Sequence, residues 1–224
     1  PLRLYFFTGA FGYGVRVSDG REGVEPIFGG QLAGRGIVPL PEVAVNPLAL
    51  RQESMVDAVA TRPRMPVWIE AAHGYRTPMC EAISVAGEHA YQWTQQFPNS
   101  FPPIVINITD GMVTDSPFGD ADLTTWASRL TGVATNDGPA LLLNVFLSSS
   151  QERPIWFPES PYGLPDPGPS LFSISSPLPA PMIENAQSQG VGVSPGARGL
   201  AFNADLAMLI KFLEIGTRVD VRDH

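Results

Sequence analysis

Two residues of this chain lie at positions where α/β proteins commonly bind ligands or catalyse reactions. Asp110 directly follows the apolar run Ile104–Thr109, and Thr77 precedes a helical stripe that begins at Met79. In an open parallel sheet, ligands bind at the carboxyl ends of the strands, where loops and helix N-termini converge. A hydroxyl and a carboxylate, together with water, form an all-oxygen shell that suits Mg²⁺ or Mn²⁺ better than softer metals. Their placement makes Thr77 and Asp110 candidate ligands of a divalent metal ion.

A purely structural interpretation of the same two residues stays open. Thr77 fits the cap position before a helix, with Pro78 in the first helical turn. Asp110 and Gly111 form a common turn dipeptide. Because caps and such turns are frequent, the spacing alone favours this simpler interpretation.

Three further residues are candidates for the rim of the site. Arg76 would place a cation beside Thr77, where it would repel a metal ion or bind an acidic partner, although a solvated loop residue is the simpler role. Asp115 follows Asp110 in the same loop, and a loop-capping role explains it equally well. Ser148 begins a serine run after an apolar segment, and such runs also form ordinary turns.

The elements that would position these residues follow from hydrophobic spacing. Apolar residues recur at helical spacing from Met79 to Phe97 and again from Leu123 to Val133. Nearly continuous apolar runs at 104–109 and 140–147 are typical of strands covered on both faces of a parallel sheet. Strand, helix and strand in this order predict a parallel pair with a right-handed crossover.

The rest of the chain is predicted in less detail, as a single domain over 1–224 with Gly/Pro-rich insertions at about 18–64 and 150–181. Prolines occupy eight of the 24 positions from Pro158 to Pro181, which predicts an extended loop there. The remaining expected elements are strands at 2–8, 66–70 and 200–202, and helices at 182–189 and 204–213, the last capped by Asn203.

Composition limits the class of protein. With 224 residues, 44% of them hydrophobic, the chain is long enough to form a substantial core. Its 22 acidic and 14 basic residues give a net charge of −8 without a local basic cluster, which disfavours a nucleic-acid partner. No apolar run approaches the roughly 18 residues that cross a bilayer, so no membrane segment is expected. The single cysteine, Cys80, cannot form an internal disulfide; a core position and a cytoplasmic protein are expected.

Several segments carry a resemblance to a known family. The segments 74–79 (GYRTPM) and 106–111 (INITDG) resemble the second and third motifs of the metal-ion-dependent adhesion site of von Willebrand factor A (vWA) domains. The likeness runs across nearly the whole chain and is nearest to a group of bacterial, cytoplasmic-type vWA proteins. It also rests on the segments 11–14, 29–35, 77–82, 102–115, 195–199 and 202–206.

The resemblance implies a fold and a function. The fold would be a Rossmann-like, three-layer α/β sandwich with a mostly parallel central sheet. The function would be protein binding without catalysis, in which Thr77 and Asp110 hold Mg²⁺ or Mn²⁺ and a carboxylate of the protein partner completes the shell. The sequence departs from the family's metal-site motifs in two ways. The first motif, Asp-x-Ser-x-Ser, is absent, and Tyr75 and Arg76 replace the usual glycines. We therefore expect an N-terminally truncated domain that lacks its central first strand and binds Mg²⁺ weakly.

Two other functions are compatible with parts of the sequence. One is a scaffold of the same fold that uses no metal. The other is a serine hydrolase, because the segment 192–196 (GVSPG) fits the nucleophile pattern G-x-S-x-G with Ser194 at its centre. No strong strand precedes it, Pro195 follows the serine, and the chain has only three histidines, so an enzyme is not expected.

Overall fold

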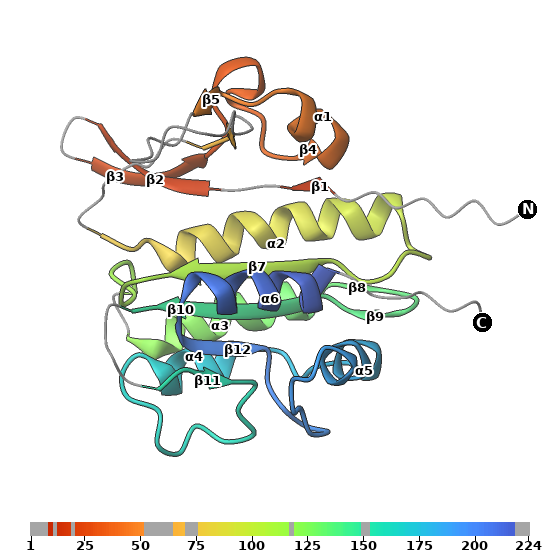
Figure 1. Cartoon of the computed structure of the whole chain (residues 1–224). Helices are drawn as coiled ribbons and strands as arrows, with labels where there is room; N and C mark the ends of the chain where they lie inside the picture. The colour runs from red at the N-terminus through yellow and green to blue at the C-terminus, as the bar shows by residue number, and fades with distance from the viewer. Residues whose placement is uncertain are drawn as a thin grey trace, which may run out of the picture. The chain divides into compact units, whose positions relative to one another are not determined.

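The computed structural model describes residues 9–10, 13–18, 21–51, 65–69, 76–116, 119–148 and 153–217. Contacts divide the chain into two compact units, an N-terminal unit, Pro1–Pro78, and a C-terminal unit, Met79–His224. Figure 1 gives the elements of both units in chain order. The strand expected at 2–8 lies outside the described residues, and the single domain with two insertions stays a prediction.

The N-terminal unit consists of short elements paired two by two. Each of its sheets has two antiparallel strands, and these pair β1 (Gly9–Ala10) with β4 (Val38–Pro39), β2 (Tyr13–Ser18) with β3 (Arg21–Pro26), and β5 (Ala49–Arg51) with β6 (Met65–Val67). A 3₁₀ turn, η1 (Gly30–Leu32), and a helix, α1 (Leu40–Val45), lie between them in sequence. The described part of the Gly/Pro-rich connection thus contains regular elements, because paired strands of two to six residues satisfy part of its backbone.

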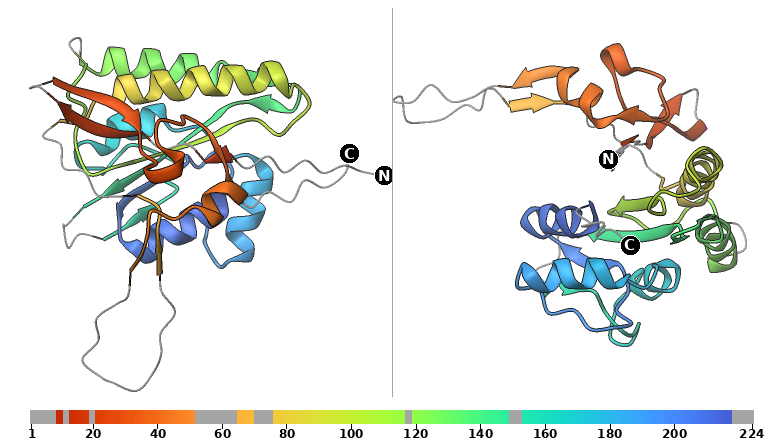
Figure 2. Two further views of the ribbon diagram at one scale, coloured as in Figure 1. Left: turned by 90° about the horizontal axis from the view of Figure 1, so that it is seen from above. Right: turned by 90° about the vertical axis from the view of Figure 1, so that its right-hand side faces the viewer.

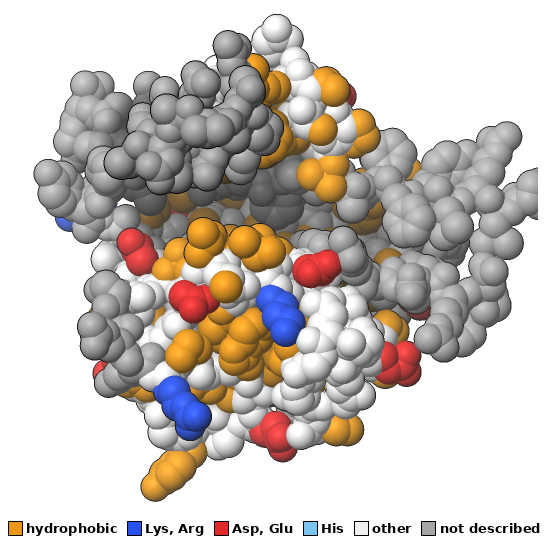
Figure 3. Space-filling view, viewed as in Figure 1, with side chains coloured by type: hydrophobic (Ala, Val, Ile, Leu, Met, Phe, Trp, Pro, Cys, Tyr) orange, Lys and Arg blue, Asp and Glu red, His pale blue; other side chains and the backbone are white. Residues whose placement is uncertain are grey.

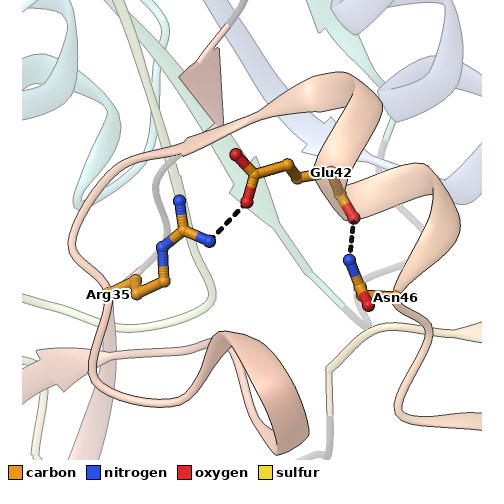
Figure 4. A network of polar contacts seen from close by, with 3 residues as sticks. All are labelled: Arg35, Glu42 and Asn46. Carbon is orange, nitrogen blue, oxygen red and sulfur yellow. Dashed lines mark hydrogen bonds and ion pairs between the residues drawn. The ribbon is translucent and has the colours of Figure 1, made fainter.

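Glu42 holds α1 through both its side chain and its backbone (Figure 4). Arg35 Nη1 donates a hydrogen bond to the Glu42 carboxylate, which also forms an ion pair with it. Asn46, the residue that ends α1, donates from Nδ2 to the Glu42 carbonyl at 2.8 Å. Among the described residues of this unit, Phe28, Leu32 and Val38 form a buried hydrophobic cluster, with Ile27 and Val43 packed against it.

The C-terminal unit is built on a four-stranded sheet with the order β11–β12–β10–β7. The strands are β7 (Ile104–Thr109), β10 (Leu141–Leu147), β11 (Ile155–Trp156) and β12 (Leu200–Ala204). β10 runs parallel to both β7 and β12, and the short β11 is antiparallel to β12. The predicted parallel pair at 104–109 and 140–147 is confirmed, and the unit is a mixed α/β fold with a mostly parallel sheet.

Helices lie on both faces of this sheet (Figure 2). One face carries α2 (Met79–Gln96), α3 (Asp120–Thr131) and α4 (Gly168–Ile174), and the other carries α5 (Ala180–Ser188) and α6 (Leu206–Thr217). α3 and α4 both contact β10, whereas α6 contacts β12. Packing under α6 is close, since a Cβ added at Gly216 would lie 3.2 Å from Leu143 Cδ1.

Coverage of the two apolar strands differs. Every residue from Leu141 to Val145 is buried, as the sequence predicts for a strand covered on both faces. β7 carries a similar apolar run, yet the side chain of Ile108 is 45% exposed, so the prediction is wrong for this strand. The reason is position: among the described strands β7 is the last of the sheet, and α6 packs over β12.

The extended loop predicted from Pro158 to Pro181 is also wrong in part, because α4 lies within it. Pro167 precedes the helix and Pro169 occupies its first turn, where the missing proline N–H has no helical partner to lose. Leu171 and Ile174 are buried on its inner face. Proline density alone therefore does not exclude a short helix whose first turn holds the proline.

The cap predicted at Asn203 is likewise wrong. Asp205 fills this role, since its Oδ1 accepts a hydrogen bond from the Met208 amide at 2.7 Å. Asn203 still belongs to β12 and has a φ of 55°, where β12 shifts register against β10. The strand runs two residues further than the apolar pattern indicated, and α6 begins correspondingly later.

The outer face of α6 is unusually apolar. Leu206 and Ile210, one turn apart, are 72% and 58% exposed, while Met208, Phe212 and Ile215 are buried on the inner face. Figure 3 shows hydrophobic side chains gathered over this helix. Even so, none of the helices in the described part of the chain has the length and apolarity to span a membrane.

Candidate functional site

Asp110 lies at the carboxyl end of β7 and is exposed. The turn that follows the strand is held by Thr109, whose Oγ1 accepts from the Gly111 amide at 3.2 Å. Within the described residues, the Asp110 carboxylate has no hydrogen-bond or ion-pair partner. It is therefore available to bind a ligand, and it is not the group that stabilises the turn.

The first turn of α2 lies at this same edge of the sheet. Asp115 Oδ1 accepts from the Cys80 amide at 3.1 Å, and Oδ2 accepts from the Glu81 amide at 2.8 Å. Asn107 of β7 adds a contact from Nδ2 to Met79 Sδ at 3.6 Å. Helix α2 thus begins beside the loop that carries Asp110, and of the two roles considered for Asp115 its contacts support the capping role.

The other predicted site residues are placed as follows. Ser148 directly follows β10, and because Phe146 pairs with Thr109 in the parallel register, Ser148 lies at the edge that carries Asp110. Arg76 is exposed and Thr77 half-buried. Both belong to the N-terminal unit, so the predicted approach of Thr77 to Asp110 stays a prediction.

The donors at this edge can be compared with what a hard cation requires. The described residues contain no group of three or more His, Cys, Asp or Glu side chains arranged to hold a metal. Mg²⁺ commonly binds proteins through one or two carboxylates and keeps several of its waters. The single free carboxylate of Asp110 fits such a hydrated ion, with hydroxyl ligands required from neighbouring segments.

A buried polar network crosses the sheet below this edge. Asn107 Nδ2 donates to Asn144 Oδ1 at 2.9 Å, and Asn144 Nδ2 donates to Ser175 Oγ at 2.9 Å. Ser175 Oγ in turn donates to the Leu171 carbonyl at 2.7 Å. Asn144 is fully buried, so this network fixes β7, β10 and the end of α4 in one arrangement. The only signal in the sequence was an asparagine inside each of two apolar strands.

Cys80 is confirmed as a core residue. Its side chain is 4% exposed, and burial, with a smaller contribution from the Asp115 charge, raises the pKa of its thiol to about 11. A thiol with so high a pKa carries almost no thiolate at neutral pH, and the thiolate is the nucleophilic form.

Ser194 lies in a loop. The preceding element is α5, and the residues after Ser194 form a turn, with the Ala197 amide donating to the Ser194 carbonyl at 3.2 Å. A nucleophile elbow requires a strand before the serine and a helix after it. The local backbone around Ser194 has neither.

Comparison with known proteins identifies no relative. No protein-family model, no curated protein and no solved structure matches the chain.

Proposed function

We propose that this chain is a vWA-type protein-binding module with a three-layer, Rossmann-like α/β fold. In this proposal Asp110 and Thr77 hold Mg²⁺, or Mn²⁺, at the carboxyl edge of the sheet, and the ion binds an acidic group of a partner protein. The observation that carries the proposal is the free, exposed carboxylate of Asp110 beside the start of α2.

Chain connectivity supports the role of Thr77. Thr77 precedes Met79 by two residues, so their Cα atoms are separated by less than about 8 Å for any arrangement of the two units. Met79 itself contacts Asn107, three residues before Asp110 on β7. Connectivity therefore keeps Thr77 close to the first turn of α2, and the proposal requires its hydroxyl to approach Asp110.

The residues around the ion would each have a limited task. Asp110 would bind it directly or through water, and Ser148 would offer a further oxygen from the end of β10. When bound, the ion supplies a positive charge that attracts a partner's carboxylate. Arg76, which is exposed, would add a second positive charge for the same acidic group.

Exposed apolar surface favours a protein as the partner. α6 begins after the carboxyl end of β12, so its first residue, Leu206, belongs to the edge that carries Asp110. Leu206 and Ile210 are both exposed. Clusters of exposed apolar side chains rimmed by polar residues commonly mark protein interaction surfaces.

Calorimetric titration of Mg²⁺ tests the proposal. We expect this chain to bind Mg²⁺ weakly, Asp110→Ala to lose that binding, and Thr77→Val to bind more weakly still. Asp137→Ala is the matched control, because Asp137 is also exposed but precedes β10, at the opposite edge of the sheet. Binding that survives Asp110→Ala would place the ion elsewhere. A chain that binds no Mg²⁺ would favour the metal-independent scaffold.

A further inference from the structure

A cavity of about 420 Å³ lies at the amino edge of the sheet, opposite the edge that carries Asp110. Its walls come from α3, from the hairpin of β8 (Ala134–Thr135) and β9 (Gly138–Pro139), from the first residues of β10 and from the segment after α4. Small-molecule sites have volumes of roughly 300 to 1,000 Å³. The cavity is therefore large enough for a small organic ligand.

The only cationic side chain among the residues that line this cavity is Arg198. Its Nη1 donates to the Ser175 carbonyl at 2.7 Å, and its guanidinium lies 5.4 Å from the centre of the Phe172 ring. No carboxylate of the described residues forms an ion pair with it. A guanidinium has five N–H donors, so donors remain for an anion in the cavity.

Arg198 is held in place by buried groups. Ser175 is 1% exposed, and its hydroxyl belongs to the network with Asn144 and Leu171. The Arg198 backbone is fixed as well, because its amide donates to the Pro158 carbonyl at 2.9 Å. A cation positioned before a ligand arrives binds it with a smaller loss of conformational entropy.

The rest of the lining limits the ligand. Apolar side chains form much of the wall, among them Phe101, Ala127, Leu141, Ile174 and Leu178. Asp137 also lines the cavity and contributes a negative charge. One guanidinium together with one carboxylate favours a ligand with a single negative charge over a phosphate dianion, and the apolar wall favours a ligand with a hydrocarbon body.

From this arrangement we infer that the cavity is a binding site for a small organic monocarboxylate with an apolar body, anchored by Arg198. The site is separate from the proposed metal site, and neither depends on the other.

Titration with benzoate, followed by amide NMR shifts of the full chain, tests this inference. We expect saturable shifts confined to the residues that line the cavity, at 101–102, 124–131, 137–141, 173–179 and 198. Benzyl alcohol, which has the same ring without the charge, should bind roughly tenfold more weakly or worse, because a hydrogen bond to a charged group is lost. Arg198→Gln should weaken benzoate binding by a similar factor, and Asp137→Asn should strengthen it.

Two further variants keep the test decisive. Ser128 is an exposed residue of α3 that lines the cavity. Ser128→Phe should therefore obstruct the cavity without removing an internal contact. This variant tests the inference if Arg198→Gln does not fold. Asp110→Ala should leave benzoate binding unchanged, which separates this inference from the metal proposal. Equal binding of benzoate and benzyl alcohol, no saturable binding of benzoate, or full binding in Ser128→Phe would overturn the inference.

Discussion

The two units of this chain are stabilised in different ways. In the C-terminal unit a continuous apolar layer lies between α6 and the sheet, and side chains such as Leu143, Val145 and Phe212 are at most 1% exposed. In the described part of the N-terminal unit, the core cluster contains three buried residues and the strands pair two by two. Short-range polar contacts such as Arg35 with Glu42 supplement that cluster.

The described polar contacts differ in how far they reach along the sequence. In the N-terminal unit Arg35 and Glu42 are seven positions apart and Trp68 and Val43 are 25 apart, whereas in the C-terminal unit Asp115 caps a helix 35 positions away and Asn107 and Asn144 are 37 positions apart. Long-range contacts of this kind form only when the whole sheet is assembled. We therefore expect the C-terminal unit to unfold cooperatively and the N-terminal unit to open at lower free energy.

The largest expected effect is a cavity in the C-terminal core. Leu142 is completely buried in the central strand β10, so Leu142→Ala should lower the unfolding free energy of this unit by about 3 to 5 kcal/mol. Leu32→Ala, in the smaller cluster, should cost about 2 kcal/mol and affect the N-terminal unit. Native-state hydrogen exchange measures the opening free energy of amides in each unit separately. The proposed contrast between the two cores would be wrong if Leu142→Ala lowered the unfolding free energy by no more than Leu32→Ala does.

An intermediate effect is expected from the long-range cap of α2. Asp115→Ala leaves the amides of Cys80 and Glu81 without their acceptor and should cost about 1 to 2 kcal/mol in the C-terminal unit. Asp110→Ala is the matched control in the same loop and should leave stability nearly unchanged, because its carboxylate has no partner among the described residues. Urea unfolding measures both variants, and equal losses would contradict this assignment of roles.

The smallest effect is a difference in acid sensitivity. Burial lowers the pKa of His89, so as pH falls below roughly 6.5 the unfolded C-terminal unit takes up a proton before the folded one and stability declines. The hydrogen bond from Arg35 lowers the pKa of Glu42, so its contribution to the N-terminal unit is present above roughly pH 4.3 and is lost as pH falls through the folded pKa.

Urea unfolding followed by NMR at several pH values separates the two titrations. His89→Gln should flatten the decline of the C-terminal unit between pH 6.5 and the folded pKa, and Glu42→Gln should flatten only the more acidic decline of the N-terminal unit. Both changes should be slight. A decline of the C-terminal unit that persists in His89→Gln would assign it to another group.

Elements whose signal is local could be predicted from the sequence. The stripe from Met79 onward defines α2 to within one residue, and the apolar runs define β7 and β10 as parallel neighbours. Helix α4 could not be predicted, because the prolines on both sides of it resemble a loop. The cap predicted at Asn203 is wrong because β12 continues past its apolar residues.

The candidate site divides in the same way. Asp110 could be placed at a strand end from sequence alone, since a run of β-branched residues followed by Asp-Gly marks that end. The sequence could not predict that the Asp110 carboxylate has no partner among the described residues. That property arises because Thr109 holds the turn and Asp115 caps α2. Asp115 caps α2 by accepting from amides 34 and 35 positions away, and no pattern within its own loop indicates this capping role.

The sequence by itself therefore determined the longer elements α2, β7, α3 and β10 and their order, because hydrophobic periodicity acts within each element. Only the tertiary structure decided that β7 is the last described strand and half-covered, that two asparagines meet inside the sheet, and that Arg198 lines a cavity. The physical reason is that burial, hydrogen-bond partners and cavities depend on which side chains folding brings together. The positions of these side chains along the sequence do not indicate which of them will meet.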